Sequence, residues 1–236
     1  MTPKQIYNEI AAKKIIENLE KRNMQGFFVK NKEEALQKAL SLIPNKSTIC
    51  WGGSQSIIQI GLIDELYKRD YTLFDRAKAT NQEEIDEIYR QAFLSDFYLA
   101  SANAITLDGK IVNIDGTGNR VAAMIYGPKN VILIVGINKI AKDEASAIER
   151  VKNYASPINA IRLNRNTPCT IKGNCYDCFS SDTICCVTSV QRFSRFKYYL
   201  FLIYIICQFN FFSFEYIINK VKFIFWRNLY EYLARY

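Results

Sequence analysis

Short apolar runs alternate with helix-forming segments over residues 48–156, and this order constrains the fold more than any other feature of the chain. The run NVILIVG, residues 130–136, is apolar without interruption after its first residue. Such a run is typical of a strand in a sheet that is covered on both faces. The alternation predicts an α/β domain with helices on both faces of a mainly parallel sheet. Because LDGK at 107–110 suits a hairpin turn, we expect a mixed sheet.

Helix signals in the sequence are local and strong at the N-terminus. Thr2 precedes Pro3 and stands three residues before Gln5, a capping-box pattern with proline at the first helical position. This pattern predicts a helix over residues 3–22. Further helices are expected at 32–43, 56–69, 81–94, 119–127 and 142–155, and strands near 48–51, 71–74, 96–106, 110–114 and 130–136.

The net charge of +8 is distributed unevenly. Residues 191–236 carry seven Lys and Arg against two Glu, which leaves +3 for residues 1–190. A nearly neutral body without a basic stripe gives no reason to expect a nucleic-acid partner. The polar N-terminus lacks the apolar core of a signal peptide, so we expect a cytoplasmic protein, in which disulfides are uncommon.

The chain contains no histidine, which excludes Ser-His-Asp and Cys-His catalysis and any zinc site with a histidine ligand. Acid or base catalysis would therefore fall to Asp, Glu, Lys, Tyr or Cys.

The first candidate site is a glycine turn. Gly52, Gly53 and Ser54 follow a short strand and precede a helix, where free backbone N–H groups can bind an anion. The alternative is a tight turn in which Ser54 only caps the helix.

The second candidate is IVNIDGTGNR, residues 111–120. Gly116 and Gly118 permit a positive φ, and the polar side chains around them can bond the local backbone as turn residues do. Alternatively they line a ligand site, in which Arg120 would pair with Asp115 or hold a carboxylate or phosphate. The residues alone do not decide between these alternatives. The polar residues of this segment are Asn113, Asp115, Thr117, Asn119 and Arg120.

The third candidate is the cysteine segment, residues 169–186, at the end of the body. Its cysteines have the spacing C-x5-C-x2-C-x6-C-C, and the CxxC pair is a common bite for one metal ion. Zinc or an iron–sulfur cluster fits four thiolates, and the spacing does not separate the two. A redox dithiol or free thiols remain the alternatives. The predicted ligands are Cys169, Cys175, Cys178 and Cys185, followed directly by Cys186.

Taken together, these three stretches resemble the LUD-domain family, the lactate utilization proteins of the C-subunit-like group. The similarity covers about residues 3–188 and is most specific over residues 95–140. The resemblance implies a fold like the NagB/ribose-5-phosphate isomerase/CoA-transferase group, in which an early glycine turn lines the ligand pocket. It also implies a part in the oxidation of L-lactate to pyruvate beside iron–sulfur protein subunits. The family has a polar segment, and the positions that correspond to it in this chain are Asn103, Asp108, Asn113, Asp115, Gly116, Thr117, Gly118, Asn119 and Arg120.

On this basis we expect a LUD-like α/β domain over residues 1–190. Its pocket would bind a small anionic metabolite or cofactor at the strand ends. Asp108 and Asp115 are the acid or base candidates, because a desolvated carboxyl has a raised pKa. The alternative is a non-catalytic accessory subunit of an iron–sulfur oxidoreductase system, with the cysteine segment as a structural metal site.

Residues 191–236 form an aromatic and basic tail that departs from the family. They hold 17 of the 32 aromatic residues of the chain and contain no Gly, Pro or Asp. Three alternatives stay open: an out-of-frame translation, a membrane-associated helix over 198–218, or a packed extension. A helix needs about 20 apolar residues to cross a bilayer, and Gln208, Asn210 and Glu215 interrupt the run. A membrane partner is expected only if the tail is genuine.

Overall fold

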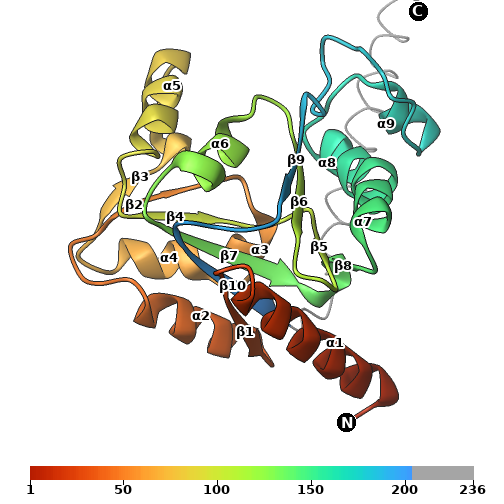
Figure 1. The fold of residues 1–236 in the computed structure, drawn as a ribbon. Coiled ribbons are helices and arrows are strands. Elements are labelled where there is room, and N and C mark those ends of the chain that lie inside the picture. The colour runs from red at the N-terminus through yellow and green to blue at the C-terminus, as the bar shows by residue number, and fades with distance from the viewer. Residues whose placement is uncertain (204–236) are drawn as a thin grey trace, which may run out of the picture. The chain divides into compact units, whose positions relative to one another are not determined.

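The computed structural model describes residues 1–203. Six strands form the main sheet, and every neighbouring pair runs parallel (Figure 1). In spatial order these strands are β1 (Gln25–Val29), β10 (Lys197–Ile203), β7 (Asn130–Gly136), β4 (Phe97–Ala100), β2 (Thr48–Trp51) and β3 (Thr72–Phe74). The predicted α/β class with a mainly parallel sheet is therefore confirmed. The strand β1 was not anticipated from the sequence.

A second, four-stranded sheet lies beside the main one. Its strands in spatial order are β8 (Ile140–Ala141), β5 (Ala104–Thr106), β6 (Ile111–Asp115) and β9 (Val187–Gln191). β5 and β6 form the predicted antiparallel hairpin, and Gly109 takes a φ of +84° in its turn. The hairpin does not join the main sheet as expected, because its strands pair with β8 and β9 instead.

Helices cover both faces of the main sheet, as the alternation predicts. One apolar cluster joins α1 (Pro3–Glu20) and α6 (Asn119–Tyr126) to one face, together with Ala92 at the end of α5 (Gln82–Gln91). The opposite cluster joins α2 (Lys32–Ser41), α3 (Gln55–Gln59) and α4 (Leu62–Tyr67). The predicted capping box of α1 is confirmed, since Thr2 and Gln5 each bond the backbone N–H of the other.

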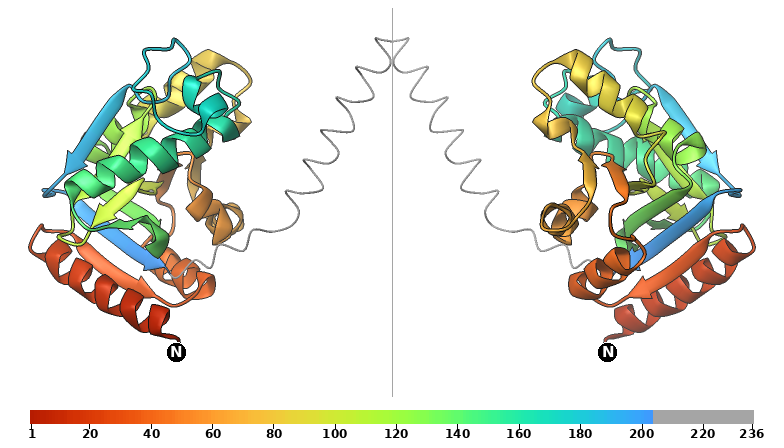
Figure 2. Two further views of the ribbon diagram at one scale, coloured as in Figure 1. Left: turned by 90° about the vertical axis from the view of Figure 1, so that its right-hand side faces the viewer. Right: turned by 90° about the vertical axis from the view of Figure 1, so that its left-hand side faces the viewer.

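The last helical layer packs on the second sheet. α7 (Glu144–Arg150) passes through a π-helical turn (Val151–Ala155) into α8 (Ser156–Arg162), and α9 (Pro168–Lys172) follows. Ala147 and Val151 share a buried cluster with Val112 and Ile114 of β6. In the left view of Figure 2, this layer faces the viewer. The layer carries the cysteine segment at its end.

The helix expected over residues 56–69 is divided into two. Gly61 has a φ of +72° between α3 and α4 and stands at the N-cap of α4. Residues with a Cβ rarely adopt this left-handed conformation, whereas glycine does so without strain. A glycine inside an apolar helical pattern therefore marks the break.

β10 lies in the segment that the sequence analysis assigned to the tail. It runs between β1 and β7, and Tyr198, Phe201 and Ile203 are fully buried in the core. The boundary expected after residue 190 falls inside β9, and the membrane helix considered over 198–218 begins with residues that form this strand. The rest of that segment, residues 204–236, lies outside the described residues. Within residues 1–203, no helix has the length and apolarity that crossing a membrane requires.

Candidate functional site

Three parallel strands end at one edge of the main sheet, and polar side chains gather there. Lys139, in the turn Ile137–Lys139 after β7, extends its ammonium group between two buried serines. Its Nζ lies 2.8 Å from Ser101 Oγ, after β4, and 3.3 Å from Ser56 Oγ, in α3. We call the following residues the strand-end cluster: Ser56, Ser101, Asn103, Asn113, Asp115, Arg120 and Lys139.

Arg120 is the centre of this cluster. Its Nε donates to Asp115 Oδ2 at 3.0 Å. Nη1 donates to Asn113 Oδ1 at 2.7 Å and to the Ser101 carbonyl at 3.1 Å. Nη2 donates to Asn103 Oδ1 at 3.1 Å and to the Ile114 carbonyl at 2.9 Å. A guanidinium group has five N–H donors, and all five have acceptors in the protein. A ligand that contacts Arg120 must therefore displace one of these acceptors.

Asn103 and Asn113 connect the hairpin strands around Arg120. Asn103 Oδ1 accepts the Ile114 N–H at 3.0 Å, and Asn113 Oδ1 accepts the Asn103 N–H at 3.1 Å. Asn113 is almost fully buried, and a buried amide without hydrogen-bond partners would lower the stability of the fold. Both side chains therefore hold the backbone and Arg120 at the same time.

The loop after β6 has the hydrogen bonds of a turn. Asp115 Oδ1 accepts the Gly118 N–H at 2.9 Å, and Gly118 has a φ of +83° at the start of α6. Thr117 Oγ1 donates to Asn119 Oδ1 at 2.6 Å on the exposed side of the loop. The loop therefore satisfies these polar groups itself, as expected if it serves as a turn between β6 and α6. Ligand binding by Gly116, Thr117, Gly118 and Asn119 stays a prediction.

The glycine turn after β2 touches the same cluster. A Cβ at Gly52 would lie 3.1 Å from Arg120 Cδ, so a side chain at this position would require Arg120 to shift. Ser54 caps α3 by accepting the Ile57 N–H at 3.4 Å. Arg76 lies against Gly53 and donates to the Tyr89 hydroxyl at 3.1 Å. The two glycine-containing segments that the sequence analysis selected therefore meet in space.

Asp108 lies apart from the cluster, in the hairpin turn. Its carboxylate pairs with Arg22 at 2.9 Å and Lys110 at 3.6 Å, and it accepts a hydrogen bond from Thr106. Partial burial opposes ionisation, but Thr106, Lys110 and Arg22 outweigh it, so the pKa of Asp108 is lowered. The length of β6, at about 3.3 Å per residue, separates it from Asp115. The two candidate carboxylates do not share one site.

The four predicted metal ligands line a single cavity of about 140 Å³. Lys152, Ser156 and Ile114 complete part of its wall. The six cysteines within residues 1–203 form no disulfide, and Cys207 lies outside the described residues. In the same range, no three His, Cys, Asp or Glu side chains stand close enough together to hold a metal ion. The cavity thus brings the thiols to one place without forming a closed site.

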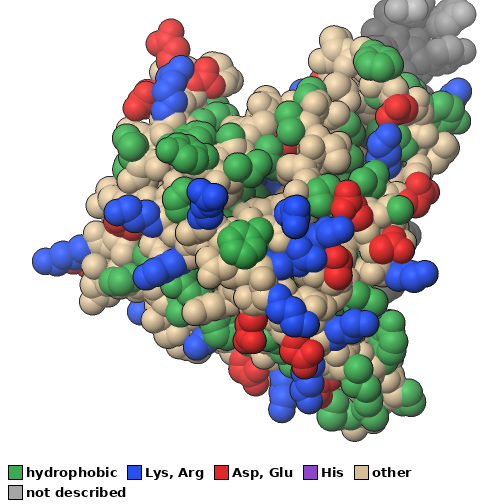
Figure 3. Space-filling view, viewed as in Figure 1, with side chains coloured by type: hydrophobic (Ala, Val, Ile, Leu, Met, Phe, Trp, Pro, Cys, Tyr) green, Lys and Arg blue, Asp and Glu red, His purple; other side chains and the backbone are tan. Residues whose placement is uncertain are grey.

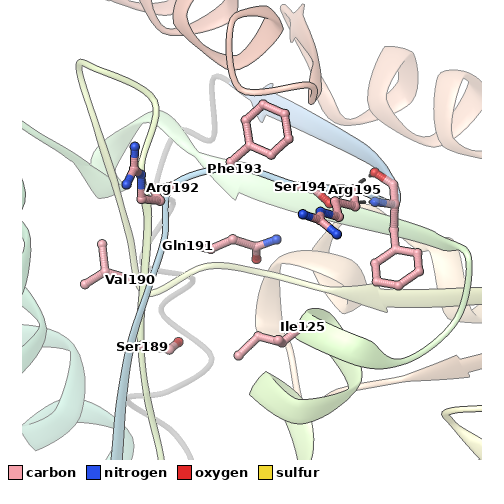
Figure 4. A pocket seen from close by; sticks show the side chains of 9 residues that line it. Ile125, Ser189, Val190, Gln191, Arg192, Phe193, Ser194 and Arg195 are labelled. Atoms are coloured by element: carbon pink, nitrogen blue, oxygen red, sulfur yellow. Dashed lines mark hydrogen bonds between the residues drawn. The ribbon is translucent and has the colours of Figure 1, made fainter.

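A larger cavity, of about 350 Å³, lies between Ile125 and residues 189–196 (Figure 4). Gln191 and the basic side chains of Arg192 and Arg195 are among its lining residues. None of the residues predicted as site residues lines it. On the face shown in Figure 3, basic and acidic side chains are interspersed.

Four polar residues near the strand ends were not selected from the sequence. They are Ser56, Arg76, Ser101 and Lys139. A local signal exists for two of them, because Ser101 directly follows the apolar run of β4 and Lys139 stands three residues after β7. These two polar residues lie one and three residues after their strands and reach the edge where the parallel strands end.

The fold and this cluster define a parallel-sheet α/β protein whose polar side chains converge where the strands end. The sequence model of the LUD domain matches residues 12–203. The chain therefore belongs to the LUD domain family, which supports a general relation to lactate utilization proteins.

The crystal structure of a DUF162 family protein from Deinococcus radiodurans is similar, with 12% identity and a TM-score of 0.48. The similarity covers 83% of this chain and 98% of that chain. No curated protein matches the sequence.

Proposed function

We propose that the protein binds a small carboxylate metabolite at the strand-end cluster and contributes to the oxidation of L-lactate to pyruvate in the cytoplasm. The observation that carries this proposal is the position of Lys139, whose ammonium group lies between the hydroxyls of Ser56 and Ser101 at the end of three parallel strands. Ligands of open α/β sheets bind beyond the carboxyl ends of the strands.

The charges around this edge suit an anion. Lys139 and Arg76 approach the edge from different elements, and Arg76 contacts the glycine turn at Gly53. The only carboxylate of the cluster, Asp115, is paired with Arg120 at 3.0 Å, so its negative charge is offset. A carboxylate that replaced part of the present surroundings of Lys139 would form charge-assisted hydrogen bonds with its ammonium group. Arg120 acts in this proposal as a positioning residue.

Calorimetric titration of the full chain with L-lactate and with pyruvate tests the binding. We expect Lys139→Ala to weaken binding by about tenfold or more, because a hydrogen bond to a charged group contributes roughly 1.5–3 kcal/mol. Lys142→Ala removes a nearby exposed lysine and serves as the matched control. Equal affinity of Lys139→Ala and the unsubstituted protein for the tighter ligand would contradict the proposal, as would the absence of binding heat for both acids.

A second function, that of a non-catalytic accessory subunit, is favoured by the ion pairs of the two candidate carboxylates. Asp108 and Asp115 are both held by arginines. An accessory role predicts that lactate oxidation requires an added iron–sulfur protein subunit and survives Asp115→Asn. A catalytic role predicts that Asp115→Asn abolishes turnover in a protein that remains folded, as judged by circular dichroism.

A further inference from the structure

We propose that Arg76, Tyr98 and the turn of Gly52 and Gly53 form an oxyanion subsite, which binds a phosphate or carboxylate group of a ligand beyond the end of β2. We call these four residues the glycine-turn subsite. It adds a contact to the carboxylate site at Lys139 and does not depend on that site. Two observations carry it: a buried tyrosine whose hydroxyl has no partner within residues 1–203, and a guanidinium group that no carboxylate in this range pairs with.

The side chain of Tyr98, in β4, is only 2% exposed. Its hydroxyl forms no hydrogen bond with any residue in the described range, 1–203. No fully buried side-chain nitrogen or oxygen atom in this range lacks a partner, so the hydroxyl oxygen must border a space that solvent can enter. A hydroxyl in apolar surroundings is unfavourable without a hydrogen-bond partner. An acceptor atom of a ligand in this space would supply that partner.

The two glycines leave room beside both polar groups. A Cβ at Gly52 would lie 3.1 Å from the hydroxyl oxygen of Tyr98, and a Cβ at Gly53 would lie 2.5 Å from Arg76 Nη2. The hydroxyl and the guanidinium group therefore lie against consecutive residues of one turn. A side chain at either position would crowd the polar group beside it, whereas glycine keeps both groups within reach of a ligand.

Both polar groups lie on the side of the main sheet that α5 covers. Tyr98 belongs to the same apolar cluster as Cys50 of β2 and Ile88 of α5. Arg76 follows β3, and its guanidinium group lies 5.8 Å from the ring centroid of Tyr89, also in α5. α5 and α6 stand on this same side of the sheet (Figure 1). One ligand group between the turn and α5 can therefore meet both Arg76 and Tyr98.

Arg76 keeps most of its hydrogen-bond donors for a ligand. Within residues 1–203, its only hydrogen bond runs from Nη1 to the Tyr89 hydroxyl, at 3.1 Å. The adjacent Asp75 does not pair with it, because the Asp75 carboxylate accepts the Tyr67 hydroxyl at 2.6 Å and the Ala77 N–H at 2.9 Å. A guanidinium group has five N–H donors. Arg76 thus differs from Arg120, whose five donors all have acceptors in the protein.

The chemistry of these groups selects an oxyanion. Burial raises the pKa of the Tyr98 hydroxyl and outweighs the opposite effect of Arg120 and Arg76, so the hydroxyl keeps its proton at neutral pH and can donate it in a hydrogen bond. Arg76 contributes a permanent positive charge and a planar pair of donors, which fits the oxygens of a carboxylate or a phosphate. A ligand group at this turn must therefore supply acceptors and a negative charge.

Calorimetric titration of the full chain with inorganic phosphate and, separately, with acetate tests the proposal. The anion that binds more tightly identifies the preferred group. We expect Tyr98→Phe, which removes only the hydroxyl, and Arg76→Gln each to weaken its binding by about tenfold, because each loses a hydrogen bond to a charged group. The exposed Tyr7→Phe and Arg69→Gln are the matched controls and should bind like the unsubstituted protein. No binding of either anion, or unchanged affinity in Tyr98→Phe or in Arg76→Gln, would overturn the subsite.

Chemical labelling of the unsubstituted protein locates the bound anion without any substitution. Phenylglyoxal reacts with guanidinium groups, and mass spectrometry identifies the labelled arginines. Phosphate or acetate, whichever binds more tightly, should slow the labelling of Arg76 and leave that of the exposed Arg69 unchanged. Equal labelling of Arg76 with and without the anion would show that the anion binds elsewhere and would contradict the proposal. Neither measurement uses L-lactate or pyruvate, so the failure of this proposal and the failure of the proposed function are distinguishable.

Discussion

Asp115 and Arg120 form an ion pair at 3.0 Å, with side chains only 7% and 15% exposed. Asp115 ends β6 and Arg120 lies in the first turn of α6, so the pair joins a strand to the helix that follows it. Asp115 also accepts the Gly118 N–H, and the remaining N–H groups of Arg120 donate to the two asparagines and to the Ser101 and Ile114 carbonyls. Two buried charges persist in such a place only when hydrogen bonds compensate their desolvation.

Replacing Arg120 should therefore destabilise the domain strongly. We expect Arg120→Ala to lower the free energy of unfolding by about 3–5 kcal/mol, because it leaves the Asp115 carboxylate buried without its partner. Arg120→Lys should recover only part of this loss, since an ammonium cannot reach five acceptors. Urea denaturation at neutral pH measures the difference, with exposed Arg162→Ala as the control. An unfolding midpoint of Arg120→Ala equal to that of the control would refute the central role of this side chain.

The two adjacent glycines should respond differently to alanine. A Cβ at Gly52 meets Arg120 Cδ and the buried Tyr98 hydroxyl, each at 3.1 Å, and neither can move away easily. We expect Gly52→Ala to cost about 1–3 kcal/mol of stability, as overpacked sites do. A Cβ at Gly53 meets only the far end of the Arg76 side chain, so Gly53→Ala should cost less than about 1 kcal/mol. Thermal unfolding of both variants checks the order, and a reversed order would show that the turn is not packed on Arg120.

Asp108 should contribute stability that depends on pH in the acid range. The pKa of its carboxyl is lowered in the folded protein. Its contribution is therefore complete above the unfolded-state pKa of about 3.9 and is lost as the pH falls through the lower folded-state value.

Because the Asp108 side chain is 49% exposed, the contribution should be below about 1 kcal/mol. Denaturation of Asp108→Asn and the unsubstituted protein should differ at pH 7 and converge towards pH 2. The exposed Asp64→Asn variant serves as the control. A difference that grows on acidification would contradict this assignment.

Cys50 and Cys186 should differ sharply in their reaction with alkylating reagents. Burial raises the pKa of the Cys50 thiol to about 11, so only roughly one thiol in a thousand is ionised at pH 8. Cys186 is exposed. Mass spectrometry after brief treatment with iodoacetamide should find Cys186 labelled and Cys50 labelled only after unfolding. Rapid labelling of Cys50 in the native protein would show that β2 opens readily.

Several elements could be predicted because their signals are local. The capping box of Thr2 and Gln5 and the proline between them predict α1 from four consecutive residues. The uninterrupted apolar run of β7 likewise predicts a strand buried on both faces, and β7 lies inside the main sheet.

The place of β10 could not be derived in this way. The composition of KYYLFLI suits a central strand as well as a membrane helix. Only the pairing with β1 and β7, from Gln25 and Asn130 onwards, shows that residues 197–203 form a strand of the main sheet. The partners of a strand are far away in the sequence, so composition does not identify them.

At the candidate site, the polar residues and glycines that follow the strands can be recognised from the amino-acid sequence alone, because strand ends and turns depend on local residue types. The contacts of these residues follow from the folded arrangement of the two sheets. It directs all five donors of Arg120 to acceptors in the protein, brings Lys139 to Ser101, and keeps Asp108 away from Asp115. The reason is physical: hydrogen bonds and ion pairs depend on distances of about 3 Å between atoms from separate elements, and these distances exist only once the sheets have assembled.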